Sequence, residues 1–285
     1  MKSEISVVHL IHVPFGVSLF ERFLGSYIEH RAGVDHRLVI MFNGVDGEDQ
    51  IEPFLEIINS FGLDYDVILS KETWDISSYF FAARQLDSEY LLFLNSYSIV
   101  LADDWLYFYS LAMRKPQVGI VGATGAGWRS EFENFLERNQ SIRAKNLKSL
   151  MFMRLHFNKF RGPHLRTNAF YVKRNQFLSL KYDKPLLERP LTDLALDSKA
   201  RTVYFEHGNR NMTYQFAEKG LKSLVVDRFG KSYEPQDWLS SKTFWISAQE
   251  NLLIHDNRTL KYENADEQLR RVFSYEAWGV KSSPK

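Results

Sequence analysis

Two stretches of the sequence carry polar side chains at positions where chemistry would be expected. Residues 90–94, YLLFL, form an apolar run that stops at Asn95, Ser96 and Tyr97. Further along, residues 204–208, YFEHG, place Glu206 next to His207. A carboxylate or an imidazole at the mouth of a cleft can take a proton from a hydroxyl group, so each of the two is a candidate general base. The alternative for Glu206 is an ordinary solvated acid in a loop.

These side chains need a scaffold, and the first half of the chain alternates the patterns of strands and helices. Apolar runs predict strands at residues 5–13, 36–42, 64–70, 89–95 and 117–123. Helical spacing of apolar residues predicts helices between them, at 17–31, 48–62, 75–86 and 103–114. Such alternation is typical of parallel strands joined by helices, and near-continuous apolar strands indicate that both faces of the sheet are covered. We therefore expect an α/β fold with a mostly parallel central sheet and helices on both faces.

The second half of the chain is less regular. Its patterns predict a strand followed by a helix at 167–180, a helix at 210–220, a strand at 221–227 and a charged helix at 265–278. No internal repeat or low-complexity linker divides the chain. We expect one main domain at residues 1–230, with a helical and irregular C-terminal extension at 231–285 packed on the same domain.

The composition narrows the class of protein. The 285 residues are 45% hydrophobic and 25% charged, which is ordinary for a soluble globular protein. The formal net charge of +1 gives no bias towards nucleic acid. The absence of cysteine excludes disulfides and thiolate metal sites. No apolar run approaches the ~20 residues of a membrane span, so a cytoplasmic protein is expected.

Ligands of open α/β sheets bind beyond the carboxyl ends of the strands. Asn43, after the second strand, could bind the edge of a heterocycle or could be a turn residue before Gly44. Asp75 could accept a hydrogen bond from a base or a ribose, or could be a helix N-cap. The same rule gives the full set of candidate donor-binding residues: His12, Pro14, Phe15, Asn43, Lys71, Asp75, Asn95, Ser96 and Tyr97.

Two other kinds of site receive weaker support. The glycine-rich residues 122–127, GATGAG, could cradle a phosphate group, but a plain sharp turn is the preferred interpretation because the Walker lysine is absent. The histidines show no metal-binding spacing, and the end of the strand at Asn95 has no carboxylate. Asp103 and Asp104 remain as substitutes, although N-capping is their preferred role. We expect no metal site, and Mg²⁺ or Mn²⁺ remains an alternative that the residues do not favour.

The order of these parts resembles the family 2 glycosyltransferases, which have the nucleotide-sugar-binding GT-A fold, a Rossmann-like sheet. HVPFG at 12–16 resembles the opening strand end of that family, and VIMFNG at 39–44 lies where the family has an acid that contacts the nucleobase. Residues 89–106, EYLLFLNSYSIVLADDWL, resemble the segment yllfLDDDt…pgwL. Residues 205–226, FEHGNRNMTYQFAEKGLKSLVV, resemble gEDvdlclRareaGyrv, which carries the acid that activates the acceptor. The resemblance covers roughly residues 5 to 230.

The resemblance implies a hexosyltransferase that moves a sugar from a nucleotide-sugar donor to a glycan or lipid-linked acceptor, in polysaccharide biosynthesis. Glu206 or His207 would be the base of an inverting reaction, with Asp193 and Asp197 as further acids. The chain departs from the family where Asn95, Ser96 and Tyr97 replace the metal-binding acids, so weak or no metal dependence is expected. The main alternative is a non-catalytic protein of the same fold that binds a sugar or a partner enzyme. A nucleotidyltransferase is disfavoured because the N-terminus has no phosphate loop rich in lysine and glycine.

A basic stretch in the second half offers cations in place of a metal. Residues 139–166 contain no acidic side chain. The basic segment from Arg143 to Arg166, together with Lys71 and Arg129, is a candidate to stabilise the leaving diphosphate. If residues 145–159 form a helix, its cations fall on one side, which suits a peripheral contact with an anionic membrane at the inner face. The preferred alternative is an amphipathic helix packed on the core.

Overall fold

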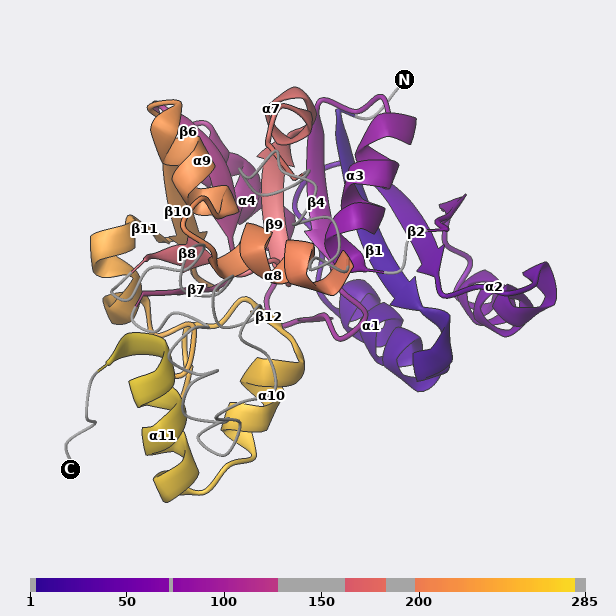
Figure 1. Cartoon of the computed structure of the whole chain (residues 1–285). Coiled ribbons are helices and arrows are strands. Elements are labelled where there is room, and N and C mark those ends of the chain that lie inside the picture. The colour runs from indigo at the N-terminus through magenta and orange to yellow at the C-terminus, as the bar shows by residue number, and fades with distance from the viewer. Residues whose placement is uncertain (1–3, 72–73, 128–161, 183–197, 280–285) are drawn as a thin grey trace, which may run out of the picture.

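A computed structural model describes residues 4–71, 74–127, 162–182 and 198–279, and its centre is a sheet of eight strands (Figure 1). Across the sheet, the strands are β11 (Ser232–Tyr233), β10 (Lys222–Val226), β6 (Val118–Gly122), β9 (Ala169–Lys173), β4 (Tyr90–Leu94), β1 (Ile5–His12), β2 (Arg37–Asn43) and β3 (Asp66–Leu69). The strand segments predicted from apolar runs all occur, although their ends shift by a few residues.

The sheet is mostly parallel. β1 pairs in parallel with β2 and β4, β2 with β3, and β10 with β6. β9 runs antiparallel between β4 and β6, and β11 runs antiparallel on β10. The register sets His12 opposite Asn43, and Leu94 opposite Ala169 at the start of β9. The carboxyl ends of β1, β2 and β4 therefore meet the amino end of β9 at one edge of the sheet.

Helices cover both faces, as the uninterrupted apolar strands predict. One face packs against α1 (Ser18–Glu29), α2 (Glu52–Ser60) and α4 (Trp105–Met113). The other packs against α3 (Asp75–Gln85), α7 (Arg174–Leu178), α8 (Ser198–His207) and α9 (Met212–Glu218). Successive strand residues point to opposite faces: Val7 lies in the first cluster and Val8 in the second, and both are fully buried. The α/β fold with a mostly parallel sheet is confirmed.

The segment after residue 230 contributes to the sheet and to its carboxyl edge. It supplies β11 and the 3-10 helix η3 (Pro235–Ser241). It then supplies β12 (Ile254–His255), which pairs with β5 (Ile99–Val100) directly after β4. The helices α10 (Asn257–Glu263) and α11 (Glu267–Trp278) follow and lie below the sheet in the view of Figure 1. Phe244, Trp245, Tyr262 and Phe273 form a smaller apolar cluster here.

The glycine-rich residues 122–127 serve close packing. Gly122 ends β6, and the short strand β7 (Gly125–Ala126) pairs with β8 (His164–Leu165). A Cβ atom on Gly125 would lie 2.5 Å from the Trp238 ring, and one on Gly122 would lie 2.7 Å from Leu165. Because such contacts are too short for real atoms, a side chain at Gly125 would displace the Trp238 ring, and one at Gly122 would displace the end of the Leu165 side chain. Residues 122–126 are buried, so they form a packed corner rather than an open phosphate cradle.

Three N-cap expectations are wrong. Trp74 occupies the N-cap position of α3, and Asp75 is the first helical residue, where its Oδ1 accepts from the Ile76 N–H at 2.9 Å. α4 begins at Trp105, and the side chain of Asp104 before it makes no capping bond. Asp103 and Asp104 instead accept hydrogen bonds from Arg31, at 3.0 and 3.2 Å. They hold the end of α1 against the start of α4.

Among the described residues, we find no helix that has both the length and the apolar character needed to cross a membrane. Arg129, Asp193, Asp197 and the proposed amphipathic helix at 145–159 lie outside the described residues.

Candidate functional site

A cavity of about 310 Å³ opens at the carboxyl edge of the sheet. It collects most of the residues that the sequence places after strand ends, together with the two candidate bases: His12, Phe15, Asn43, Asp75, Asn95, Ser96, Tyr97, Glu206 and His207. Pro14 and Lys71 are exposed and do not line this cavity. The cavity is thus built by segments that are far apart in the sequence and that the parallel strands bring to one edge.

The ends of β1 and β2 are joined by side chains. His12 and Asn43 are opposite each other in the register, and His12 Nδ1 lies 2.9 Å from Asn43 Oδ1. The Asn43 amide nitrogen donates to the Ser78 hydroxyl at 3.3 Å. Asn43 is buried as the last residue of β2, so it is not a solvated turn residue. Within the described residues, the other N–H of its amide group has no hydrogen-bond partner, so it is available to a ligand.

The polar triplet after β4 ties the strand ends together. Asn95 Oδ1 accepts from the Tyr97 N–H at 3.1 Å and from the Ser98 hydroxyl at 3.3 Å. The Ser96 hydroxyl accepts from the His12 N–H at 3.0 Å and donates to the Leu10 carbonyl at 2.9 Å. Hydrogen bonds within the protein therefore already occupy the side-chain oxygens of Asn95 and Ser96.

Aromatic rings form one wall of the cavity. The Phe15 ring lies 4.6 Å from the His12 ring and 5.3 Å from the Tyr97 ring, measured between centroids. Phe15 is 47% exposed, which leaves a ring face open at the mouth of the cavity. A planar heterocycle can stack on such a surface.

The charges of Asp75 and Glu206 both act on the buried hydroxyl group of Tyr79. Burial raises the pKa of the Asp75 carboxyl above its ordinary value. The pKa of Tyr79, one turn later on α3, is raised well above its ordinary value by burial and further by the charges of Asp75 and Glu206. Both carboxylates are therefore close enough to act on Tyr79, which places the start of α3 and the end of α8 on the same side of the cavity.

Glu206 and His207 end α8, so the interpretation of Glu206 as a solvated loop acid is wrong. Their side chains are only 20% and 12% exposed, and Glu206 Oε2 lies 3.7 Å from His207 Nε2. The Thr167 hydroxyl donates to Glu206 Oε1. Burial, together with the charges of His164, Arg258 and Arg166, holds the pKa of His207 well below its ordinary value. At neutral pH the His207 imidazole is therefore neutral.

The sequence analysis missed Thr167 and Asn168, just before β9, and named Arg166 only as the last residue of the basic stretch. All three line the cavity because β9 is antiparallel and starts at the carboxyl edge. The Asn95 N–H donates to the Asn168 carbonyl at 3.0 Å, which joins this segment to the end of β4. A search limited to residues that follow strands cannot find them. The direction of β9 was the missing information, and the apolar pattern does not reveal it.

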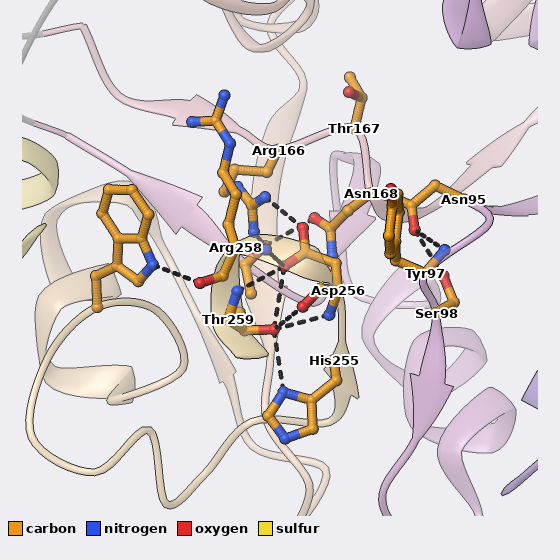
Figure 2. A network of polar contacts seen from close by, with 12 residues as sticks. Asn95, Tyr97, Ser98, Arg166, Thr167, Asn168, His255, Asp256, Arg258 and Thr259 are labelled. Carbon is orange, nitrogen blue, oxygen red and sulfur yellow. Dashed lines mark hydrogen bonds and ion pairs between the residues drawn. The ribbon is translucent and has the colours of Figure 1, made fainter. Parts of the chain in front are cut away.

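A buried ion pair fixes the C-terminal segment to this edge. Arg166 donates to Asp256, which is fully buried (Figure 2). The Arg166 guanidinium also lies over the Phe244 ring at 4.3 Å. Asp256 caps α10 through a capping box with Thr259. Burial alone would raise the pKa of the Asp256 carboxyl, but Arg166 and the hydrogen bonds from Thr259 hold it below its ordinary value. Asp256 is therefore ionised and brings Asn257 and Arg258 to the cavity.

The residues at this edge do not suit the divalent metal that the resembled family uses. Within the described ranges, no group of three or more His, Cys, Asp and Glu side chains is placed to hold a metal ion. At the position of the acidic triplet, Asn95 and Ser96 offer neutral oxygens that already accept hydrogen bonds. Mg²⁺ and Mn²⁺ prefer carboxylate ligands. We therefore derive no step through a metal at this position.

No family model matches this sequence, and no curated protein matches it. Among solved structures, the chain is similar to the mannosyltransferase PcManGT from Pyrobaculum calidifontis in complex with GDP-Man and Mn²⁺, with 13% identity, a TM-score of 0.41, and coverage of 61% of this chain and 46% of that one. It is also similar to GalNAc-T7 with UDP, GalNAc and Mn²⁺ (16% identity, TM-score 0.42, coverage 61% and 35%). A third is mouse xyloside xylosyltransferase 1 in its apo form (11% identity, TM-score 0.42, coverage 80% and 86%).

The chain thus spans less than half the length of the first two proteins. The mannosyltransferase and the xylosyltransferase are glycosyltransferases by name, and none of the comparisons singles out family 2. Because the similarity is low, the function of this chain has to be argued from the side chains of its own site.

Proposed function

We propose that this protein is a glycosyltransferase that moves a sugar from a nucleotide-sugar donor to a hydroxyl group of a glycan or lipid-linked acceptor, with inversion at the anomeric carbon. The observation that carries the proposal is the place of Glu206. This carboxylate lies at the end of a helix, mostly buried, in the cavity at the carboxyl edge of the sheet, where open α/β folds bind their ligands. The resemblance of the sequence to family 2 supports the same reaction.

Glu206 is the residue suited to act as the base. As the acceptor oxygen forms a bond to the anomeric carbon, its proton passes to the Glu206 carboxylate. The bond between the anomeric carbon and the diphosphate oxygen breaks, and the nucleoside diphosphate leaves with the electron pair. The Thr167 hydroxyl donates to one oxygen of this carboxylate, and the other oxygen lies 3.7 Å from His207 Nε2.

His207 is less suited to this step. A base becomes protonated in the reaction, and a protonated His207 would be a buried cation close to Arg166 and Arg258. The free-energy cost of burying this cation lowers the pKa of the His207 imidazole. Protonation of Glu206, in contrast, removes a charge. We therefore assign the proton transfer to Glu206 and the support of its carboxylate to the neutral His207.

The donor nucleoside fits the other half of the cavity. Phe15 and Tyr97 offer ring faces for stacking, and Asp75 and the free N–H of Asn43 offer polar groups for a base or a ribose. Asp75 is suited to accept from a ligand because its hydrogen bond from the Ile76 N–H uses one of its two oxygens.

Two measurements test the proposal against a non-catalytic role. Thermal shifts with nucleoside diphosphates and nucleotide sugars identify the donor, because a ligand that binds only the folded state raises its apparent stability. Release of nucleoside diphosphate from that donor is then followed with and without added sugar acceptors. Donor-dependent release that Glu206→Gln abolishes supports the glycosyltransferase. Binding of a sugar without any turnover would establish the non-catalytic alternative.

A further inference from the structure

The cavity contains two arginines in very different electrostatic situations. Arg166 is buried and is neutralised by Asp256. Arg258 lines the cavity with an exposed side chain, and among the described residues its guanidinium has no ion pair and no hydrogen bond. Among the described residues, no carboxylate therefore forms an ion pair with Arg258.

The main chain holds Arg258 in place. Its N–H donates to Asp256 Oδ1 at 3.1 Å, and its carbonyl accepts from the Trp245 indole N–H at 3.0 Å. Figure 2 shows the Arg258 side chain extending past the Arg166–Asp256 pair, with no dashed line at its guanidinium. The charge of Arg258 contributes to the low pKa of both His164 and His207, so it acts at the end of the cavity where Glu206 lies.

A second donor at the same cavity also has no partner. Asn168 is 4% exposed and lines the cavity, and its amide nitrogen has no hydrogen-bond partner in the described part of the chain. Its Oδ1 accepts from the Thr124 hydroxyl at 2.9 Å, which fixes the side-chain orientation. A buried donor without a partner destabilises the folded state. A bound ligand with acceptor oxygens would remove that destabilisation.

We propose that Arg258 and Asn168 bind the diphosphate group of the donor. Arg258 would supply the positive charge that a divalent metal supplies in the resembled family. The planar guanidinium can donate two parallel hydrogen bonds to phosphate oxygens. Its fixed charge stabilises the negative charge that develops on the leaving diphosphate. This inference rests on the proposed function, because it assigns a residue to the donor of that reaction.

The test compares diphosphates with free nucleosides by isothermal titration calorimetry in EDTA. The probes are UDP, GDP, CDP and ADP, each beside its nucleoside, and inorganic pyrophosphate. Arg258→Gln should weaken the binding of the preferred nucleoside diphosphate about 10- to 100-fold, because a charge-assisted hydrogen bond is lost. Binding of the free nucleoside should not change. Arg258→Lys should give an intermediate affinity, because it keeps the charge and loses the planar fork.

Arg271→Gln is the matched control, because Arg271 pairs with Glu267 on α11 and does not line the cavity. Arg258→Glu is a second variant that reverses the charge of an exposed side chain and should abolish pyrophosphate binding. Equal affinities of wild type, Arg258→Gln and Arg258→Glu for the same diphosphate would overturn the inference and leave the proposed function standing. If the wild-type protein binds none of the diphosphates or nucleotide sugars, the proposed function itself fails.

Discussion

Arg166 and Asp256 are 90 residues apart in the sequence and form a buried ion pair at the centre of the candidate site. Arg166 belongs to the segment before β9, and Asp256 caps α10. The pair therefore joins the sheet to the C-terminal segment at the cavity itself. Asp256→Asn separates the contribution of the ion pair to stability from that of the helix cap, because asparagine caps helices about as well as aspartate does.

Asp256→Asn is expected to lower the free energy of unfolding by about 3–5 kcal/mol, because it leaves the buried Arg166 charge without a partner. Chemical denaturation at pH 7 measures the change. Asp266→Asn is the control, because Asp266 caps α11 at an exposed site through the Leu269 N–H. That variant should change stability by less than about 1 kcal/mol. Equal effects of the two substitutions would show that the ion pair does not stabilise the fold.

Glu206→Gln should lower kcat by roughly 100-fold or more and leave the affinity for the donor nucleotide intact, because it keeps the size of the side chain and removes the base. Steady-state kinetics and calorimetry on the same preparation separate the two effects. His207→Asn should retain more activity than Glu206→Gln. A fully active Gln variant beside an inactive Asn variant would transfer the role of base to His207.

The burial of His9 leads us to expect that the folded protein loses stability in acid. His9 lies in β1, fully buried, with its ring 3.7 Å from that of Phe23 between centroids, and within the described chain neither ring nitrogen has a hydrogen-bond partner. Burial lowers its pKa from 6.5 to about 3. The unfolded chain therefore binds a proton below pH 6.5 that the folded chain does not accept until about pH 3. Stability is fully present above this range and falls as the pH decreases through it.

Thermal or urea unfolding between pH 7 and pH 4.5 tests this prediction. Each such histidine should contribute a slope of about 1 kcal/mol per pH unit. Burial also lowers the pKa of His164, to about 4, so His9→Leu should reduce the slope without removing it. Phe20→Leu, whose ring lies 5.9 Å from that of His9 between centroids, removes no titratable group and should keep the wild-type slope. An unchanged slope in His9→Leu would contradict the assignment.

Removal of divalent ions should leave the binding of the donor nucleotide unchanged. The reason is the absence of carboxylates at Asn95, Ser96 and Tyr97, together with the hydrogen bonds that already occupy the first two side chains. Titration of the preferred nucleoside diphosphate in EDTA and in Mn²⁺ provides the measurement. Loss of binding in EDTA that Mn²⁺ restores would show that the protein holds a metal by other ligands.

The sequence predicts the sheet well because buried parallel strands leave a strong apolar signal. Strands β1, β2 and β4 could be recognised in this way, and the residues that follow them, such as His12, Asn43 and Asn95, lie at the cavity. Helix starts were predicted less well. At Asp75 and at Asp104, a carboxylate near the first turn was read as a cap, while its actual partners are the neighbouring Ile76 N–H and the distant Arg31.

The residues that the sequence did not predict reach the site by tertiary pairing. Asn168 is at the edge because β9 runs against its neighbours, and Arg258 is there because β12 pairs with β5. Neither the direction of a strand nor the partner of a two-residue strand leaves a periodic pattern. The charge pattern also favoured another segment. The basic stretch at 139–166 stands out in the sequence, whereas Arg258 is a single arginine near the C-terminal helices.

The distance in sequence between Arg166 and Asp256 also bears on the order in which the chain is made. At a synthesis rate of roughly 5–20 residues per second, Asp256 is added about 5 to 20 seconds after Arg166. The strands from β1 to β9 can associate during this interval, while the Arg166 guanidinium still awaits its carboxylate and the cavity lacks Arg258. Until Asp256 and Arg258 have been added, the site of the nascent chain is therefore incomplete. A nucleotide that binds through Arg258 cannot assist folding on the ribosome before this last segment has emerged.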